Sequence, residues 1–267
     1  QVESIPRRYR QGMDATTGRR VLITGAASGL GAALTRALHD RGDRVLACDI
    51  QGSGPHLDVT SDDDWQRAAS RVHEEWGGLD ILINNAGIAS GGRIDVADMA
   101  EWHRAVEVNL LGAVRGCRTF VPVFKAQESG TIVNVASLAG LVHPPAMASY
   151  TATKAGVVAL SETLRHELHP WGIDVFVACP GFFRTNLASS VDSADPLTSS
   201  LTQRLIGRST LDADDIASAI LRGMDEGQHV ILTDPEARAA VAAKTHARPE
   251  YDEQQFAFAE RISGRHL

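Results

Sequence analysis

Cysteine, basic charge and long apolar runs are all scarce in this 267-residue chain, and each shortage excludes a class of protein. Cys48, Cys117 and Cys179 stand far apart and form no C-x-x-C pair, so we expect buried free thiols, with no disulfide framework and no zinc knuckle. The histidine segments HEEW and HELH do not complete H-E-x-x-H, so no metal site is predicted. A net charge of -7 disfavours a nucleic-acid partner.

No apolar stretch approaches the roughly 20 residues that span a bilayer, so we expect no membrane partner. Residues 1–18 lack the apolar segment of a signal peptide, and we expect a solvated N-terminal arm, with Met13 as a candidate natural start. Together with the free cysteines, these features predict a cytoplasmic protein.

Apolar runs alternate with helical patterns from residue 19 to the C-terminal region, which predicts a single doubly wound α/β domain over 19–267 with a mainly parallel sheet of about seven strands. The expected strands cover 20–25, 43–50, 56–59, 79–87, 130–137, 173–181 and 229–233. Helical patterns cover 31–42, 60–78, 97–127, 148–172 and 211–227. The weakly periodic, Ser/Thr-rich segment 182–210 follows a strand end, and we interpret it as a substrate-binding loop or lid.

The connection between the second and third expected strands is unusually short. Residues 51–55 contain two glycines and a proline, whereas a parallel crossover normally needs a dozen residues or more. We therefore expect a loop in place of a helix, and a thinner sheet on that side.

Three glycines follow the first strand in TGAASGLG, at a turn that leads into a helix. Backbone without Cβ atoms can approach a pyrophosphate, whose charge the helix N-terminus stabilises. The spacing of Gly25, Gly29 and Gly31 differs from G-x-G-x-x-G and from a P-loop. The turn therefore favours a dinucleotide site, with a tight connection as the alternative.

Tyr150 and Lys154 lie four residues apart at the start of a helix and share one face. A phenol with a pKa near ~10 is a poor base at neutral pH, and a nearby ammonium lowers that value. Ser137 ends the strand before them, where its hydroxyl could bond a substrate oxygen. Asn109 interrupts a long helix, which indicates a local bend or a hydrogen-bonding role. For the pair and for Asn109, a purely structural role is the alternative.

The ordered set TGAASGLG, LDVT, NNAG, VNLLG, VAS, SYTATKAG and PGFFRT resembles the short-chain dehydrogenases/reductases from about Val21 to Thr233. The resemblance implies a seven-stranded Rossmann sheet, a nicotinamide cofactor, a dimer or tetramer, and a catalytic tetrad of Asn109, Ser137, Tyr150 and Lys154. Besides Tyr150 and Lys154, it implies cofactor contacts at Gly25, Ser28, Gly29, Leu30, Gly31, Asp58, Val59, Asn85, Ala86, Gly87, Pro180, Gly181, Phe182, Phe183 and Thr185.

Asp49 ends the second strand, where a carboxylate accepts hydrogen bonds from the ribose 2′-OH and repels a 2′-phosphate. Family members that read NADP tend to have a basic residue where this chain has Ser28 or Ile50, so we predict NAD as the cofactor. Within the family's pattern, the adenosine end of the cofactor would be exposed beside the short connection.

The residues expected around the substrate are mostly apolar, which favours a hydrophobic secondary alcohol or ketone, either hydroxysteroid-like or aryl-alkyl. They are Ser137, Ala139, His143, Met147, Tyr150 and Phe182, with Leu141, Pro144 and Phe183 near them. The alternative for His143 is a position at the surface, or behind the residues that contact substrate. The alternative functions are a 3-oxoacyl thioester reductase, which usually uses NADPH, and a non-catalytic regulator that senses NAD(H).

Overall fold

Among the residues that the structure describes, six parallel strands form the sheet, in the order β2-β1-β3-β4-β5-β6. A computed structural model describes residues 18–184, 195, 207 and 209–263. The strands are β1 (Arg20–Thr24), β2 (Arg44–Cys48), β3 (Ile81–Asn84), β4 (Gly130–Val135), β5 (Ile173–Ala178) and β6 (Val230–Ile231). The predicted arm 1–18 and the predicted loop 182–210 fall largely outside the described residues.

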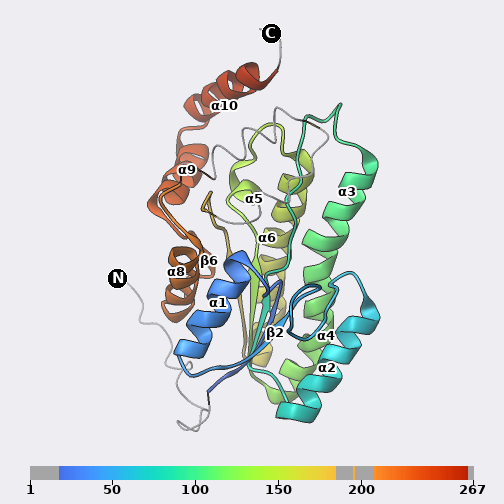
Figure 1. Cartoon of the computed structure of the whole chain (residues 1–267). Coiled ribbons are helices and arrows are strands. Elements are labelled where there is room, and N and C mark those ends of the chain that lie inside the picture. The colour runs from blue at the N-terminus through green and yellow to red at the C-terminus, as the bar shows by residue number, and fades with distance from the viewer. Residues whose placement is uncertain (1–17, 185–194, 196–206, 208, 264–267) are drawn as a thin grey trace, which may run out of the picture.

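Helices cover both faces of the sheet (Figure 1). Helices α1 (Gly29–Asp40) and α8 (Ala213–Asp225) lie on one face, and α2 (Asp62–Trp76), α4 (Gly112–Gln127) and α6 (Ala148–Leu168) lie on the other. Shorter elements are α3 (Met99–Ala105), the π-helical turn η2 (Val106–Leu111), α5 (Ala139–Val142) and the 3-10 turn η3 (His169–Trp171). The chain closes with α9 (Pro235–His246) and α10 (Arg248–Ile262).

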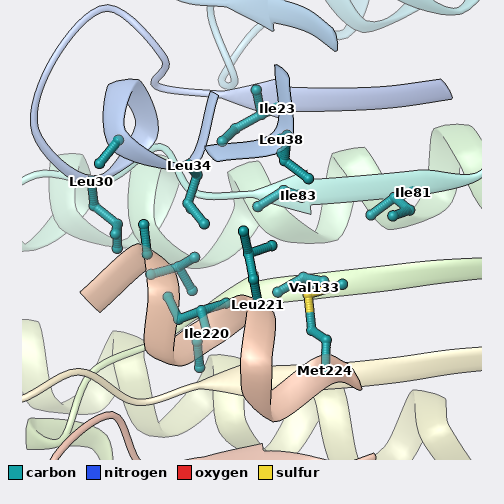
Figure 2. Packing of buried hydrophobic residues seen from close by; sticks show 14 of the residues in the cluster. Ile23, Leu30, Leu34, Leu38, Ile81, Ile83, Val133, Ile220, Leu221 and Met224 are labelled. Carbon is teal, nitrogen blue, oxygen red and sulfur yellow. The ribbon is translucent and has the colours of Figure 1, made fainter. Parts of the chain in front are cut away.

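The core follows from the alternation of side chains along each strand. Val21 and Ile23 of β1 join the core beneath α1 and α8, while Leu22 joins the core on the opposite face. Figure 2 shows the apolar stripe of α1, at Leu30, Leu34 and Leu38, across from Ile220, Leu221 and Met224 of α8. Continuous apolar strands are therefore buried on both faces, as the sequence predicted.

The described residues form six strands where about seven were predicted, because residues 56–59 form only one bridge. His56 pairs with Asp49 in parallel, and the Leu57 amide donates to the Asp49 carbonyl over 3.0 Å. Residues 51–55 bring the chain back beside β2 for that single pair, and α2 then begins after its N-cap, Ser61. The predicted absence of a helix in this connection is confirmed.

The helix expected over 97–127 is divided into α3, η2 and α4. A π-turn inserts one extra residue per turn and is frequent at functional sites. Pro122 lies inside α4 without ending it. The C-terminal helices α9 and α10 were not predicted. Among the described residues, no helix combines the length and the apolar character that a membrane crossing requires.

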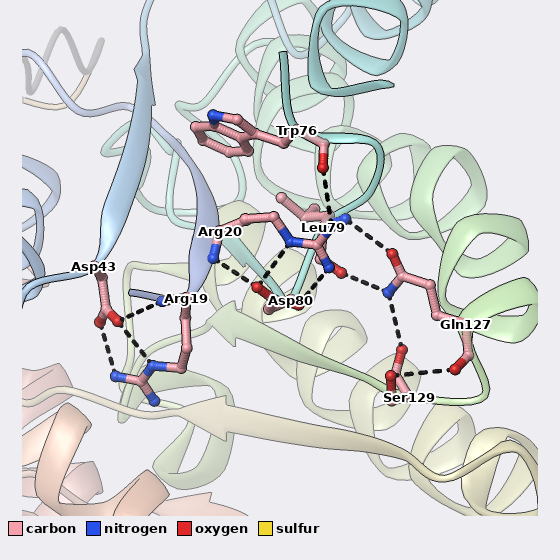
Figure 3. A network of polar contacts seen from close by, with 8 residues as sticks. All are labelled: Arg19, Arg20, Asp43, Trp76, Leu79, Asp80, Gln127 and Ser129. Atoms are coloured by element: carbon pink, nitrogen blue, oxygen red, sulfur yellow. Dashed lines mark hydrogen bonds and ion pairs between the residues drawn. The ribbon is translucent and has the colours of Figure 1, made fainter. Parts of the chain in front are cut away.

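Ion pairs fasten the amino ends of the strands, at the edge of the sheet opposite the glycine turn (Figure 3). Arg20 donates from Nη2 to Asp80 over 2.6 Å and from its backbone amide to the same carboxylate over 2.7 Å. Gln127 bonds both the amide and the carbonyl of Leu79. These contacts join β1, β3 and α4 at the amino ends of the strands, on the side of the sheet opposite the glycine turn.

Candidate active site

Ser137 lies just beyond β4, at the carboxyl edge of the sheet, where ligands bind in folds of this architecture. Its hydroxyl accepts from the Ala139 amide over 3.2 Å, and the Leu138 amide donates to the Pro180 carbonyl over 2.8 Å. The segments that follow β4 and β5 are therefore bonded to each other beside the hydroxyl.

Tyr150 and Lys154 occupy the first two turns of α6, as the spacing predicted. The Lys154 side chain is buried, at 3% exposure, and donates to the Val135 carbonyl over 2.9 Å. Its Nζ lies 5.8 Å from the centroid of the Tyr150 ring. The end of β4 thus holds the ammonium beside the phenol.

Burial shifts both groups toward their neutral forms. It raises the pKa of the Tyr150 phenol, and a hydrogen bond with Ser137 opposes that shift. It lowers the pKa of Lys154 to about 8. Desolvation outweighs that hydrogen bond in the chain by itself, so the net pKa of Tyr150 lies above its usual value, and the lowering expected from Lys154 stays a prediction.

Asn109 lies in the π-turn η2 and is buried, at 2% exposure. Its side chain accepts from the Ile88 amide over 2.8 Å and donates to the Ile88 carbonyl over 3.0 Å. A Cβ on Gly87 would lie 3.2 Å from Asn109 Oδ1 and 3.4 Å from Lys154 Nζ. All four residues of the expected tetrad are thus placed around one edge of the sheet, and a hydrogen-bonding role for Asn109 is observed.

The glycine turn fits a dinucleotide pyrophosphate. Gly25 has φ +66°, and a Cβ there would lie 2.8 Å from the Ala86 Cα, while a Cβ on Gly31 would lie 2.0 Å from the Gly25 carbonyl oxygen. Ser28, the N-cap of α1, makes no side-chain capping bond. The first amides of α1, with Gly29 and Leu30 among them, therefore have no side-chain cap, which is the arrangement that binds phosphate oxygens.

Thr24 and Asn85 fix the shape of this turn. The Thr24 hydroxyl accepts from the amides of Asn85 and Ala86 over 3.1 Å each. Asn85 Nδ2 donates to the carbonyls of Thr24 and Gly25. Sequence reasoning had not singled out Thr24, although a hydroxyl directly before the first glycine of a strand-to-turn junction is a usable signal.

Asp49 lies beside the glycine turn. Its carboxylate accepts from the Ala27 amide over 2.9 Å and from the Gln51 amide over 2.9 Å. Ile50, the next residue, is 58% exposed. The carboxylate is thus held at the open corner where the resemblance expects an adenosine ribose.

The family resemblance also implies that Asp58 and Val59 contact the adenine, and both residues make hydrogen bonds within the chain. Asp58 accepts from the amide and the hydroxyl of Thr60. Val59 is buried, and its carbonyl accepts from Trp65 Nε1 over 3.1 Å. Their contacts with adenine stay predictions.

The expected substrate residues are placed in two groups. Ala139 lies on α5 and Met147 is the N-cap of α6, and both lie between Ser137 and Tyr150 in the sequence. His143 lies at the exposed end of α5, with Nε2 3.1 Å from the Gly140 carbonyl oxygen and Nδ1 2.7 Å from Lys244 Nζ. It thus contacts the C-terminal helices, so its contact with substrate stays a prediction.

The family resemblance implies that Pro180, Gly181 and Thr185, in the segment after β5, contact the nicotinamide. Pro180 and Gly181 border Leu138, since a Cβ on Gly181 would lie 3.7 Å from Leu138 Cδ2. Phe182 is 42% exposed, and Phe183 packs against the core. Thr185 lies outside the described residues. Across the described part of the chain, no three His, Cys, Asp or Glu side chains could hold a metal ion.

Sequence comparison gives relatives with named activities. The chain is 34% identical over 67% of its length to trans-4-hydroxycyclohexanecarboxylate dehydrogenase of Sinomonas cyclohexanicum, covering 77% of that protein. It is 36% identical over 65% of its length to 3-alpha-(or 20-beta)-hydroxysteroid dehydrogenase of Mycobacterium tuberculosis, covering 72% of it. Both relatives are dehydrogenases.

Solved structures agree with this relationship. A short chain dehydrogenase/reductase of Burkholderia phymatum in complex with NAD aligns with a TM-score of 0.81 and 28% identity, over 91% of this chain and 97% of that one. A short chain dehydrogenase of Burkholderia cenocepacia in complex with NADP aligns with a TM-score of 0.77 and 27% identity, over 90% and 98%. The short chain dehydrogenase family pattern matches residues 19–196. The chain belongs to the short-chain dehydrogenase/reductase family of oxidoreductases.

Proposed function

We propose that this protein is an NAD(H)-dependent oxidoreductase that interconverts a hydrophobic secondary alcohol and its ketone. The observation that carries the proposal is the buried Lys154 ammonium, which donates to the Val135 carbonyl at the end of β4 and lies 5.8 Å from the centroid of the Tyr150 ring, with Ser137 just beyond the same strand. Two hydroxyls and a buried ammonium at the edge of the sheet suit proton transfer at a carbinol oxygen. A nicotinamide dinucleotide, when bound, supplies the ring carbon that accepts or returns a hydride.

In alcohol oxidation, the Ser137 hydroxyl holds the substrate oxygen, and Tyr150 takes the proton from that oxygen. The carbinol carbon loses its hydride as the carbonyl bond forms, so the product is a ketone. Lys154 stabilises the phenolate by its positive charge, and the Val135 carbonyl keeps the ammonium in place. Ketone reduction runs through the same groups in reverse.

The preference for NAD rests on Asp49 and its surroundings. The carboxylate is fixed by the Ala27 and Gln51 amides, and residues 50–55 contain no lysine or arginine to bind a 2′-phosphate. One related structure holds NAD and another holds NADP. The preference between the two dinucleotides therefore depends on the residues that each chain places at the adenosine ribose.

The proposed substrate class rests on the apolar side chains near Ser137 and on the relatives. Ala139, Met147 and Phe182 are apolar, and we expect them to lie around the two hydroxyls. The relatives' names point to hydroxylated ring compounds, one a carboxylic acid and one a steroid. A hydroxylated ring with a largely apolar body is therefore the first substrate to test.

The test is NADH absorbance during incubation with NAD and a panel of cyclic, steroidal and aryl-alkyl secondary alcohols at mildly alkaline pH. Tyr150→Phe should lower kcat by a factor of about 100 or more, because it removes the proton acceptor, while the Kd for NADH stays within about twofold. Thr119→Val is the control, since that hydroxyl bonds only within α4. Turnover that survived in Tyr150→Phe would refute the mechanism.

Assembly as a homodimer or homotetramer and a cytoplasmic location, without a nucleic-acid or membrane partner, belong to the same proposal. They are supported by the family resemblance and by the net charge of -7. Light scattering of the purified protein tests the assembly, and a monomer at working concentration would contradict it.

A further inference from the structure

The segment between Ser137 and Tyr150 has an unusual backbone. His143 and Ala146 have φ of 57° and 58°, and the described chain has just one other non-glycine residue with positive φ, Glu128. L-residues rarely adopt this conformation, and it persists where the surroundings fix it. Some contact must therefore hold this segment, which joins the two hydroxyls of the site.

The end of α5 shows which contacts do so. A helix of four residues cannot bond its last carbonyls internally, so they need outside donors. Lys244 Nζ donates to the Leu141 carbonyl, and the Tyr251 hydroxyl donates to the Val142 carbonyl. Lys244 Nζ also lies 2.7 Å from His143 Nδ1. Both donors come from the C-terminal helices: Lys244 lies on α9, which packs beside α5, and Tyr251 lies on α10, which packs against α9 (Figure 1).

The remainder of the segment is fixed on its other sides. The Gly92 amide donates to the Ala146 carbonyl over 2.7 Å, and Gly92 forms a parallel bridge with Met147. Gly140 packs against the backbone of α6, where a Cβ would lie 2.7 Å from the Lys154 carbonyl carbon. A displacement of α5 would therefore be felt at Ser137, where the segment begins, and at Lys154.

We propose that Lys244 and Tyr251 are positioning residues: by capping the end of α5, they hold the strained segment 138–147 so that Ser137 and Tyr150 face one substrate oxygen. The inference rests on the proposed function. The two residues lie on α9 and α10, beyond the part of the chain that the family pattern matches, which ends at residue 196.

A contact that merely docks the C-terminal helices would have a different signature. Tyr251 is buried, and Tyr251→Phe keeps its ring while removing one donor. Lys244→Met keeps the apolar stem, and Lys244→Arg restores a cationic donor. Loss of docking would lower stability in proportion to lost packing, whereas loss of positioning lowers kcat/KM in a chain that remains folded.

The experiment measures kcat/KM with the best alcohol of the panel, the Kd for NADH by fluorescence, and amide hydrogen exchange in 138–147. We expect Tyr251→Phe and Lys244→Met each to lose about tenfold in kcat/KM and to exchange faster in that segment, with the Kd for NADH within about twofold. Lys244→Arg should recover most of the loss. Glu253→Gln, at an exposed position of α10, is the matched control and should behave as wild type.

Unchanged kcat/KM in both variants, or a loss matched by an equal fall in the folded fraction, would overturn the proposal. If the wild-type protein oxidises no alcohol, the proposed function fails, and hydrogen exchange alone decides whether the two residues hold the segment. Faster exchange in 138–147 would then support the bracing of the segment, and unchanged exchange would overturn it.

Discussion

At the scale of single residues, Lys154 combines function with a cost to stability. Its pKa falls to about 8 through burial, from 10.5. Below about pH 8 the folded chain therefore contains a buried ammonium, which lowers the free energy of unfolding. This destabilisation fades between pH 8 and pH 10.5, because the folded lysine is then neutral while the unfolded one is still charged. The buried Lys154 ammonium thus serves the proposed chemistry although it lowers the stability of the fold.

Lys154→Met should therefore abolish turnover and yet raise the free energy of unfolding at neutral pH by on the order of 1–2 kcal/mol. The gain should shrink as the pH approaches about 10, near the pKa of an unfolded lysine. Urea unfolding at both pH values measures it. Lys125→Met is the control, because that ammonium lies over the Trp171 ring at the surface, 5.1 Å from its centroid. A variant less stable than wild type at neutral pH would contradict the argument.

Asp49 sets the other residue-scale prediction. Asp49→Ala combined with Ile50→Arg should shift the ratio of Kd values for NADPH and NADH by more than about tenfold toward NADPH, or roughly 1.4 kcal/mol. The change removes the carboxylate that repels a 2′-phosphate and adds a guanidinium that binds it. Fluorescence titration with both dinucleotides provides the measurement, and Asp63→Asn on α2 is the charge control. An unchanged ratio would show that Asp49 does not select the cofactor.

At the scale of elements, the short connection after β2 shapes the adenosine corner. Gly52 has φ +84°, and a Cβ there would lie 3.4 Å from the Ala27 Cβ, next to the amide that Asp49 holds. Gly77 has φ +70° at the C-cap of α2, with open space around it. The two glycines therefore share a left-handed backbone in different surroundings.

Gly52→Ala and Gly77→Ala should each strain the backbone by about 1 kcal/mol. We expect only Gly52→Ala to raise the Kd for NADH severalfold, because its strain is released by moving the loop that contacts the glycine turn. Calorimetry of NADH binding, with thermal unfolding alongside, separates the two effects. Equal NADH affinity in both variants would show that residues 51–55 play no part in cofactor binding.

Elements with strong local signals were predicted well. Continuous apolar strands, the glycine turn and the Tyr150–Lys154 spacing depend on residues close in sequence, so the sheet could be predicted from them. The tetrad as a set was expected from the family resemblance. Residues 56–59 were expected to form a strand but form a single bridge at His56. The extent of that pairing depends on how far the five residues 51–55 reach, which the sequence pattern does not show. Helix α10 was missed because Tyr251 is its one buried residue, which leaves almost no apolar periodicity. The raised pKa of Tyr150 depends on burial that only the fold creates.

At the scale of the whole molecule, the two edges of the sheet have different tasks. The carboxyl edge carries uncapped helix amides, strained backbone and a buried ammonium bonded to a backbone carbonyl, whereas the amino edge carries ion pairs. There, burial alone would raise the pKa of Asp80, but hydrogen bonds from Arg20 outweigh burial and hold that pKa below its usual value (Figure 3). A carboxyl whose pKa is depressed on folding stabilises the fold above its unfolded pKa and loses that effect as the pH falls through its folded pKa.

Asp80→Asn should therefore lower the free energy of unfolding by about 1 kcal/mol at neutral pH, a value discounted because this ion pair is partly exposed to solvent. The difference from wild type should narrow on acidification, as the pH falls below the usual aspartate range and through the lowered pKa of the folded Asp80 carboxyl. Urea unfolding across that range tests the trend, with Asp63→Asn as an exposed-acid control. The Kd for NADH should not change, because Asp80 lies at the far edge from the glycine turn. A loss of NADH affinity in Asp80→Asn would mean that the two edges are coupled, and the division of tasks would be wrong.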